Sequence, residues 1–343
     1  MEETYFLGAN SRRGFFSLYR GFGTGPEDSL HVVKGGPGTG KSGFMRRIAE
    51  AARARGLDTE IIRCSGDPDS LDGVYVPALR QAWADGTAPH TLDPAHFGAD
   101  GDYVDLGRFC RLPLREADRE RALALHGAYR SRYAAAYRWL AAAGDLEDAV
   151  PPPLLPPAAQ EKLRRRIRGI LQRRAGRGTD GEERRRFLSA VTGQGLLTLP
   201  PSGCPTVCRL DSRRGLETAA LSIAAEEAAA RGLPRVLCLS PLDPERPEAL
   251  LLPGAGLAFL GGGRAAATER SIRLDALLLP EEREEKLLRR RAAQLRRAAL
   301  EAAVGQLREA KALHDELEAV CRPYMDFPAL TAFTEAEIER IFR

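Results

Sequence analysis

One glycine-rich stretch constrains the fold of this chain more than any other feature. Residues 35–42 read GGPGTGKS and satisfy the pattern G-x-x-x-x-G-K-[ST] in full. The preceding residues 30–34 are mostly apolar and rich in β-branched side chains, which is typical of a buried strand. Three apolar residues then follow at helical spacing, namely Phe44, Ile48 and Ala52. The stretch therefore predicts a strand, a glycine loop and a helix, in that order.

This order of elements suits the binding of phosphate groups. A loop without side chains can turn tightly and direct its backbone N–H groups at phosphate oxygens, and the first turn of a helix adds further unpaired N–H groups. We expect Lys41 to contact the β- and γ-phosphates and Ser42 to bind Mg²⁺ through its hydroxyl. The loop and the first helical turn are expected to line the rest of the nucleotide site, through Gly35, Gly36, Pro37, Gly38, Thr39, Gly40 and Gly43.

Composition limits the other classes to which the chain can belong. With 343 residues, 43% of them hydrophobic and 29% charged, it is long enough for two domains and typical of a globular protein. A net charge of +4 predicts no general attraction to nucleic acid. Cys204 and Cys208 are the one close pair among six cysteines, so no zinc site is complete. Without a signal peptide or a spanning segment, we expect a cytoplasmic protein with reduced thiols and no membrane contact.

The pattern around the glycine loop predicts an α/β fold. Further strands are expected at 59–64 and 81–84, and strand–helix–strand spacing of this kind indicates a parallel sheet inside a three-layer α/β/α domain. Two helical segments, 116–145 and 161–175, surround a proline-rich turn. They are expected to form an antiparallel helical hairpin within about 114–175.

The second half of the chain repeats the order of the first. Residues 206–253 align with 30–77 without a gap, and residues 187–199 align with 6–18. A long charged helical stretch follows the second copy as it follows the first. We therefore predict a P-loop domain with a helical hairpin at 1–178 and a degenerate repeat of it, ending in long helices, at 179–343.

The two copies differ where the chemistry is expected. Glu217 stands at the position of Lys41, and the second loop has one glycine and no lysine. A carboxylate there would repel a triphosphate. The second copy is therefore expected to keep the packing of the fold but to have lost the ability to bind a triphosphate. Arg213 and Arg214 could instead bind another anion, and this alternative stays open.

A phosphate loop also requires a carboxylate at the end of a neighbouring strand, where it holds Mg²⁺. Asp85 is the first choice because it follows the apolar residues 82–84, and because Gly261 replaces it in the second copy. Asp67, just past the strand expected at 59–64, is the alternative metal ligand, although it also fits a structural Asp-Pro turn. Asp72 is a third carboxylate in this region.

Other polar residues near the loop are weaker candidates. An arginine close to the γ-phosphate stabilises the transition state, and Arg12 and Arg13 are present only in the copy that has the lysine. The alternative is that both are solvated loop residues. Thr87 and His90 follow Asp85 and are candidates for sensing the γ-phosphate, with a simple loop role as the alternative.

A basic run at 162–186 raises the question of nucleic acid as a partner. The alternative is a solvated helix whose charge is balanced by the acidic segment 281–285. Since no aromatic platform for stacking bases accompanies the run, nucleic acid is the weaker expectation.

Together these motifs resemble those of P-loop NTPases, and the sequence of the loop is most similar to the loops of ATPases and small kinases of that superfamily. Four segments are also similar to an uncharacterised family of tandem P-loop ATPases found mainly in Gram-positive bacteria: 6–19, 34–42, 64–73 and 85–90. The resemblance implies ATP and Mg²⁺ as cofactors and supports Asp85 as the second acid. The second loop, which has one glycine and no lysine, departs from the family pattern and argues against a mechanism with two nucleotide sites.

The sequence thus predicts an ATPase in which Mg·ATP at the N-terminal loop drives a conformational step or the remodelling of a partner, either another protein or a second copy of the chain. Two alternatives remain: a kinase for a nucleoside or metabolite, and an ATP-binding module associated with nucleic acid. ATP rather than GTP is implied by the resemblance alone.

Overall fold

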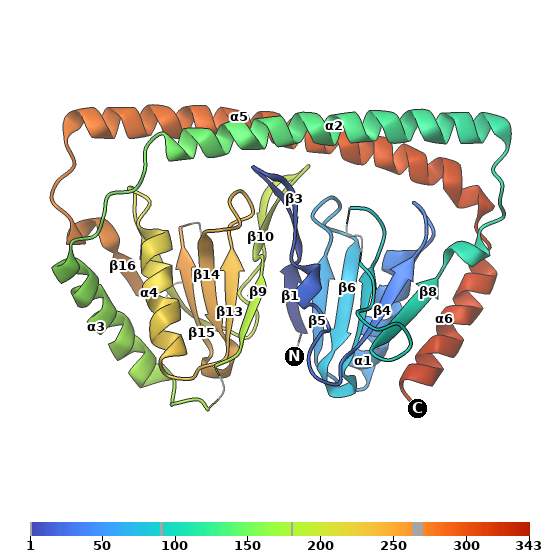
Figure 1. The fold of residues 1–343 in the computed structure, drawn as a ribbon, viewed down its shortest axis with the longest axis horizontal. Coiled ribbons are helices and arrows are strands. Elements are labelled where there is room, and N and C mark those ends of the chain that lie inside the picture. The colour runs from blue at the N-terminus through green and yellow to red at the C-terminus, as the bar shows by residue number, and fades with distance from the viewer. Residues whose placement is uncertain (1, 90–91, 180, 263–269) are drawn as a thin grey trace.

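Two mixed β-sheets stand side by side beneath a pair of long helices (Figure 1). The computed structural model describes residues 2–89, 92–179, 181–262 and 270–343. The first sheet consists, in spatial order, of β1 (Glu2–Phe6), β5 (Thr59–Arg63), β6 (Leu71–Val76), β7 (Gln81–Asp85), β4 (Ser29–Lys34) and β8 (Gly101–Asp105). The second consists, in corresponding order, of β9 (Glu183–Arg186), β13 (Arg235–Leu239), β14 (Pro247–Leu252), β15 (Leu257–Gly261), β12 (Thr206–Asp211) and β16 (Arg270–Arg273).

The strand, loop and helix predicted from the glycine motif are confirmed. β4 is followed by the loop of residues 35–40 and by α1 (Lys41–Ala54). Phe44, Ile48 and Ala52 are buried, as their helical spacing predicted, and they belong to the apolar cluster between α1 and the first sheet. The motif therefore lies at the end of β4, the fifth of the six strands in the spatial order of the first sheet.

The two sheets agree in strand direction as well as in order. In the first sheet β6 runs antiparallel to β5 and to β7, and the remaining pairs are parallel. The second sheet repeats this, with β14 antiparallel to β13 and β15. The expected all-parallel sheets are wrong because β6 and β7 are joined by the three-residue 3₁₀ turn Pro77–Leu79, which is too short for a crossover.

Helices cover one face of each sheet. α1 and α6 (Phe327–Ile341) pack on the first sheet, and α4 (Glu217–Ala229) and α3 (Pro157–Arg174) pack on the second. On the other face of the first sheet, the short 3₁₀ turn Tyr19–Gly21 and Phe22, which follows it, contribute Tyr19 and Phe22 to the apolar cluster. At this face of the first sheet the expected second layer of helices is therefore absent among the described residues, and the expected three-layer α/β/α arrangement is wrong there.

The long helices α2 (Glu116–Asp148) and α5 (Arg283–Cys321) pack against each other above both sheets (Figure 1). Ion pairs of Arg121 with Glu316 and of Arg132 with Glu309 show that they run antiparallel. Buried alanines and leucines of both helices form their contact. The expected hairpin within 114–175 is wrong, because α2 pairs with α5 of the other half and not with α3.

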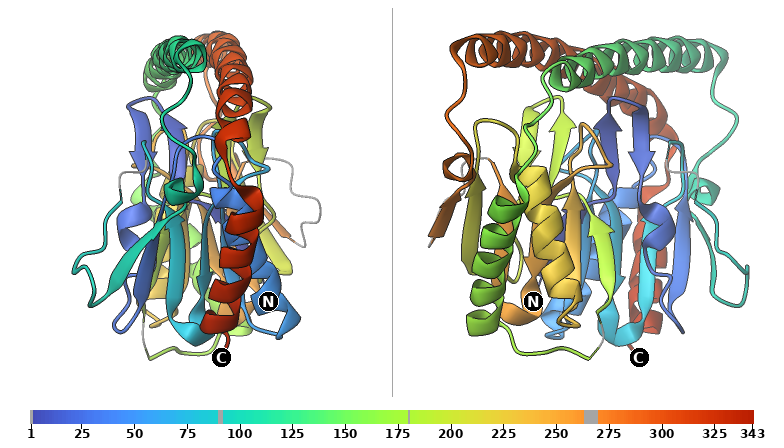
Figure 2. Two further views of the ribbon diagram at one scale, coloured as in Figure 1. Left: turned by 90° about the vertical axis from the view of Figure 1, so that its right-hand side faces the viewer. Right: turned by 60° about the vertical axis from the view of Figure 1, so that its left-hand side comes forward.

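Each long helix carries the chain from one sheet to the other. After α2 the chain enters α3, which packs on α4 of the second half, and after α5 it enters α6, which packs on α1 of the first half. Figure 2 shows α3 and α4 side by side on the second half and α6 on the first. The predicted segments 1–178 and 179–343 therefore exchange a helix: each supplies one that covers the other's sheet.

The two halves meet at the edges of their sheets. Phe6 of β1 and Phe187, next to β9, exchange two backbone hydrogen bonds of 2.9 Å. The hairpins β2–β3 (Gly8–Ser11 and Gly14–Ser17) and β10–β11 (Ser189–Thr192 and Gly195–Thr198) stand above this junction. Apolar side chains of both hairpins and both sheets form one cluster, so the halves share a core.

Candidate phosphate-binding site

The loop at residues 35–40 has a backbone that requires glycine. Gly38 and Gly40 have φ angles of 71° and 85°, in the left-handed region that other residues rarely adopt. A Cβ atom at Gly35 would lie 2.4 Å from the hydroxyl oxygen of Thr39. Gly40 is the N-cap of α1, and Gly43 lies in its first turn. The loop thus forms the tight turn into a helix N-terminus that the motif predicted.

Lys41 is the first residue of α1, and its amine points back across the loop. Nζ donates hydrogen bonds to the carbonyl oxygens of Gly35 and Gly36, at 2.9 and 3.0 Å. Nζ also lies 3.7 Å from Oδ2 of Asp85, and the two side chains are only 13% and 12% exposed. A positive charge is therefore held at the mouth of the loop, with a carboxylate as its partner.

Asp85 reaches the loop because of the strand register. It is the last residue of β7, which lies parallel to β4, and it pairs with Val33 just before the loop. Its Oδ1 accepts hydrogen bonds from the backbone N–H and the hydroxyl of Thr87, at 2.8 and 2.6 Å. Thr87 thereby orients the carboxylate toward Lys41. His90 lies outside the described residues.

Ser42 connects the first turn of α1 to β6. Its hydroxyl accepts a hydrogen bond of 2.9 Å from the backbone N–H of Leu71. Asp72, the next residue, is buried and accepts a bond of 3.1 Å from the Tyr19 hydroxyl. Asp67 lies in the turn after β5, where it accepts a bond from Ser70. The structure thus brings Lys41, Ser42 and Asp85 together at the loop and holds Asp67 in the Asp-Pro turn.

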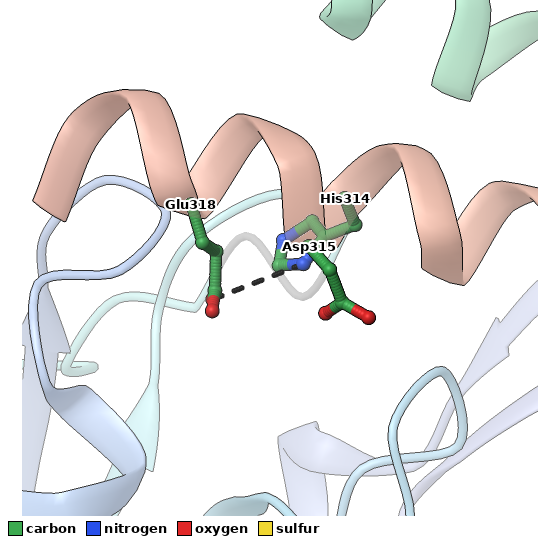
Figure 3. A group of neighbouring side chains, drawn as sticks. All are labelled: His314, Asp315 and Glu318. Atoms are coloured by element: carbon green, nitrogen blue, oxygen red, sulfur yellow. Dashed lines mark ion pairs between the residues drawn. The ribbon is translucent and has the colours of Figure 1, made fainter.

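The C-terminal part of α5 covers the loop. The N–H of Gly38 donates a hydrogen bond of 3.2 Å to Oε1 of Glu318, across 280 residues of sequence. Figure 3 shows Glu318 with His314 and Asp315 on this part of the helix, where Nδ1 of His314 is 3.8 Å from Oε1 of Glu318. One of the N–H groups that a phosphate loop offers to an anion is thus bonded to a carboxylate of the protein itself. No local sequence signal could have indicated this contact.

Arg12 and Arg13 are directed away from the loop. Both lie in the turn between β2 and β3, where Arg12 pairs with Asp145 and Asp148 of α2 at 3.0 and 2.6 Å. Arg13 pairs with Glu245 of the second half at 2.6 Å. These hydrogen bonds raise the pKa of both guanidinium groups. Arg12 also lies 3.7 Å from Asp243 of the second half, so both arginines contact that half, and their described contacts do not include Lys41.

The second half does not keep the charged pair of the first. Glu217 is the first residue of α4, as Lys41 is of α1. Gly261 faces it at the end of β15, where a Cβ atom would lie 3.0 Å from Cβ of Glu217. Burial raises the pKa of the Glu217 carboxyl. The pair of lysine and acid is thus replaced by an acid and a glycine.

In the loop of the second half, side chains of the same half accept hydrogen bonds from the backbone N–H groups. Asp275 accepts hydrogen bonds from the hydroxyl of Ser212 and the backbone N–H of Arg213, at 2.6 and 2.9 Å. The hydroxyl of Ser212 also accepts from the N–H of Arg214 at 2.9 Å and of Leu216 at 3.2 Å. These bonds use the backbone donors that would otherwise face an anion.

Several arginines of the predicted basic run are paired inside the protein. Arg164 and Arg168 contact Glu227 of α4, at 3.1 and 2.9 Å. Arg184 and Arg186 contact Glu60 of β5 across the junction of the halves. The expected balance by the acidic segment 281–285 is therefore wrong for these arginines, whose counter-charges come from α4 and β5. The contacts favour a structural role for this part of the run.

Comparison of the chain with protein-family models, with curated proteins and with solved structures found no match in any of the three. None of the described helices combines the length and the apolar composition that crossing a bilayer requires. The interpretation of the site therefore depends on its residues and geometry: a glycine loop at a strand end, a helix N-terminus, a lysine, a hydroxyl and a carboxylate.

Proposed function

We propose that the first half binds Mg·ATP at residues 35–42 and hydrolyses it. The observation that carries this is the convergence of Lys41 and Asp85, 3.7 Å apart, at the ends of the parallel strands β4 and β7. An ammonium group, a serine hydroxyl and a carboxylate are the groups that a magnesium triphosphate requires. When bound, Mg²⁺ would neutralise the charge that develops on the phosphates.

The roles of the individual residues follow from their positions. Lys41 exchanges the carbonyl oxygens of Gly35 and Gly36 for the β- and γ-phosphates. Ser42 would hold the metal through its hydroxyl and Asp85 through its carboxylate, which would also orient the attacking molecule. Thr87 keeps the Asp85 carboxylate in place through two short hydrogen bonds.

Nucleotide binding is coupled to α5. A phosphate that accepts from the N–H of Gly38 competes with Glu318, and two anions at one donor repel each other. α5 has 39 residues and is therefore about 58 Å long, reaching from the second half to the loop. We propose that displacing its end moves a rigid rod attached to both halves, and that this is the conformational step that hydrolysis drives.

We further propose that the second half is a degenerate copy of the first and serves as its scaffold. The shared strand order and the shared strand directions support this. So does the start of α4 at Glu217, the residue that aligns with Lys41. Glu217 and Gly261 stand where the first half has Lys41 and Asp85. This difference explains why the second half would keep the fold but not bind a triphosphate.

The test compares two full-length variants that are altered at aligned positions. Lys41→Met is expected to lower ATP turnover by about 10²–10³-fold, as removal of a group that stabilises developing charge does. Glu217→Gln, the matched control, is expected to retain turnover. Phosphate release and the binding of a fluorescent ATP analogue with Mg²⁺ are measured for both.

Unchanged turnover and affinity in Lys41→Met, or a nucleotide bound beside Glu217, would refute the proposal. Turnover that appears only with an added nucleoside or metabolite would identify a kinase instead. Turnover that requires DNA or RNA and falls steeply with salt would identify a nucleic-acid-associated module.

A further inference from the structure

A basic cleft lies beside the loop of the second half, at the point where α5 begins. Its volume is about 370 Å³. Two arginines from the loop after β12 and three basic residues from the first turns of α5 line it: Arg213, Arg214, Lys286, Arg289 and Arg290. Two carboxylates, Asp275 and Glu281, and an apolar wall at 278–280 complete the lining.

Both carboxylates of the cleft are already bonded. Asp275 accepts from Ser212 and from the backbone of Arg213, as described above. Glu281 accepts two hydrogen bonds from Arg289, at 2.8 and 2.7 Å, and these bonds hold the pKa of its carboxyl below the ordinary value. The charge of Glu281 also acts on Arg214 and Lys286, but five basic side chains face only these two acids in the lining, which therefore keeps an excess of positive charge.

Three of these cations have no direct hydrogen-bonded or ion-paired partner. Across the part of the chain that the structure describes, the side chains of Arg213, Lys286 and Arg290 form no hydrogen bond and no ion pair within 4.0 Å. Arg214 donates to the carbonyl oxygen of Leu279 and lies 4.0 Å from Glu285. Like charges gathered on the wall of one cleft repel each other, and a multivalent anion removes that repulsion.

We propose that this cleft binds a small molecule that carries two or more linked phosphates. Guanidinium groups recognise phosphate oxygens through paired hydrogen bonds, and the three unpaired cations match a ligand with several charges. The cleft is a small hollow between a loop and a helix, which fits a compact ligand, and its apolar wall offers contact to an organic group. Side chains here replace the backbone cradle that the second half has lost.

This second site does not depend on the proposed ATPase activity. It uses neither Glu217 nor any residue of the loop at 35–42. Yet Lys286 and Arg290 belong to α5, whose other end covers that loop through Glu318. A ligand in the cleft would therefore fix the first turns of the helix that covers the other site.

Calorimetric titration of tripolyphosphate into the full-length Lys41→Met protein tests the proposal, because this variant removes the lysine of the first site. One saturable site is expected. The double change Lys286→Ala and Arg290→Ala in the same protein is expected to weaken binding at least about tenfold, as loss of two charged phosphate contacts implies. Arg297→Ala is the control, since Arg297 is also exposed and basic on α5 but pairs with Glu301 outside the cleft.

Loss of binding in the double variant but not in the control supports the proposal. Tighter binding of ATP than of tripolyphosphate also supports the proposal, and shows that the apolar wall at 278–280 contacts the nucleoside. Equal binding of the two supports free polyphosphate as the ligand. Absence of saturable binding in the Lys41→Met protein overturns the proposal. So does equal weakening by Arg297→Ala, because binding would then follow surface charge alone.

Discussion

At the scale of single residues, the two halves differ by a matched change of charge. Asp85 faces Lys41 at the end of the adjoining strand, whereas Gly261 faces Glu217. An acid at position 261 would meet Glu217 at close range, and the two like charges would repel each other. On the proposed duplication, the glycine at this position spares Glu217 that repulsion.

Glu318 competes with phosphate for the loop, so its removal should strengthen nucleotide binding. A hydrogen bond to a charged group contributes about 1.5 kcal/mol, and about 1.4 kcal/mol corresponds to tenfold in affinity. Glu318→Ala is therefore expected to bind Mg·ATP about tenfold more tightly, as measured by titration of a fluorescent analogue.

The control for this prediction is Glu316→Ala. It removes the same charge from the same helix, but Glu316 faces Arg121 of α2 instead of the loop. Its nucleotide affinity is expected to equal that of the wild type. An equal gain in both variants would show that the net charge of α5 matters and that the contact with Gly38 does not.

Glu217 should make stability depend on pH. Burial raises the pKa of its carboxyl in the folded protein above the ordinary value of 4.5. As the pH rises above 4.5, the unfolded chain loses this proton first, so the free energy of unfolding falls until the folded carboxyl also ionises. Glu217→Gln is therefore expected to unfold at higher urea concentration than the wild type at pH 7.

The advantage of Glu217→Gln should shrink as the pH is lowered from 7 through 4.5, because the wild-type carboxyl becomes protonated in both states below that value. Urea titrations of both proteins at several pH values between these limits measure the difference. A difference that does not change with pH would show that the side-chain shape and not the charge is responsible.

At the scale of elements, the contact between α2 and α5 unites the molecule. Leu140 of α2 is fully buried in the cluster that includes Ala299, Ala303 and Leu307 of α5. Leu140→Ala is expected to lower the free energy of unfolding by about 2–5 kcal/mol, because it leaves a cavity in a close-packed contact. Leu123→Ala, at a position of α2 that is 61% exposed, is the control and should unfold within about 0.5 kcal/mol of the wild type. Urea unfolding measures both.

The sequence predicted well those elements whose structure is decided locally. The loop at 35–42 was predictable because its glycines, lysine and helix start act within a few residues. Asp85 was predictable because parallel strands end at one edge of a sheet. The reversal of β6 was missed because a run of apolar residues has no direction.

The partners of the helices could not be predicted in the same way. An apolar stripe of alanines and leucines, as on α2, fits any helix with a similar stripe, so nothing in 116–148 distinguishes α5 from α3 as its partner. The contact of Glu318 with Gly38 joins residues 280 positions apart and depends on that pairing. Arg12 and Arg13 were directed elsewhere by acids of α2 and the second half, which become neighbours only in the folded molecule.

At the scale of the whole molecule, α5 connects the proposed nucleotide site to the second half, so nucleotide binding is expected to move the halves. We expect the distance between fluorescent amino acids at two exposed positions, 97 beside β8 of the first sheet and 154 just before α3 on the second sheet, to change when a non-hydrolysable ATP analogue and Mg²⁺ are added. Energy transfer between the two labels measures the change. The same labels in the Lys41→Met protein should show no change, and a change there would contradict the coupling.

The exchange of α3 and α6 has a consequence for any attempt to divide the gene. A fragment that stops at residue 178 would expose the apolar surface that Leu330 of α6 covers. It would also end in α3, whose apolar side would be exposed because the second half is missing. The complementary fragment would have the reverse defects. Separate expression should therefore yield two fragments that aggregate and are insoluble. Refolding the two fragments together should give more soluble protein than refolding either fragment alone.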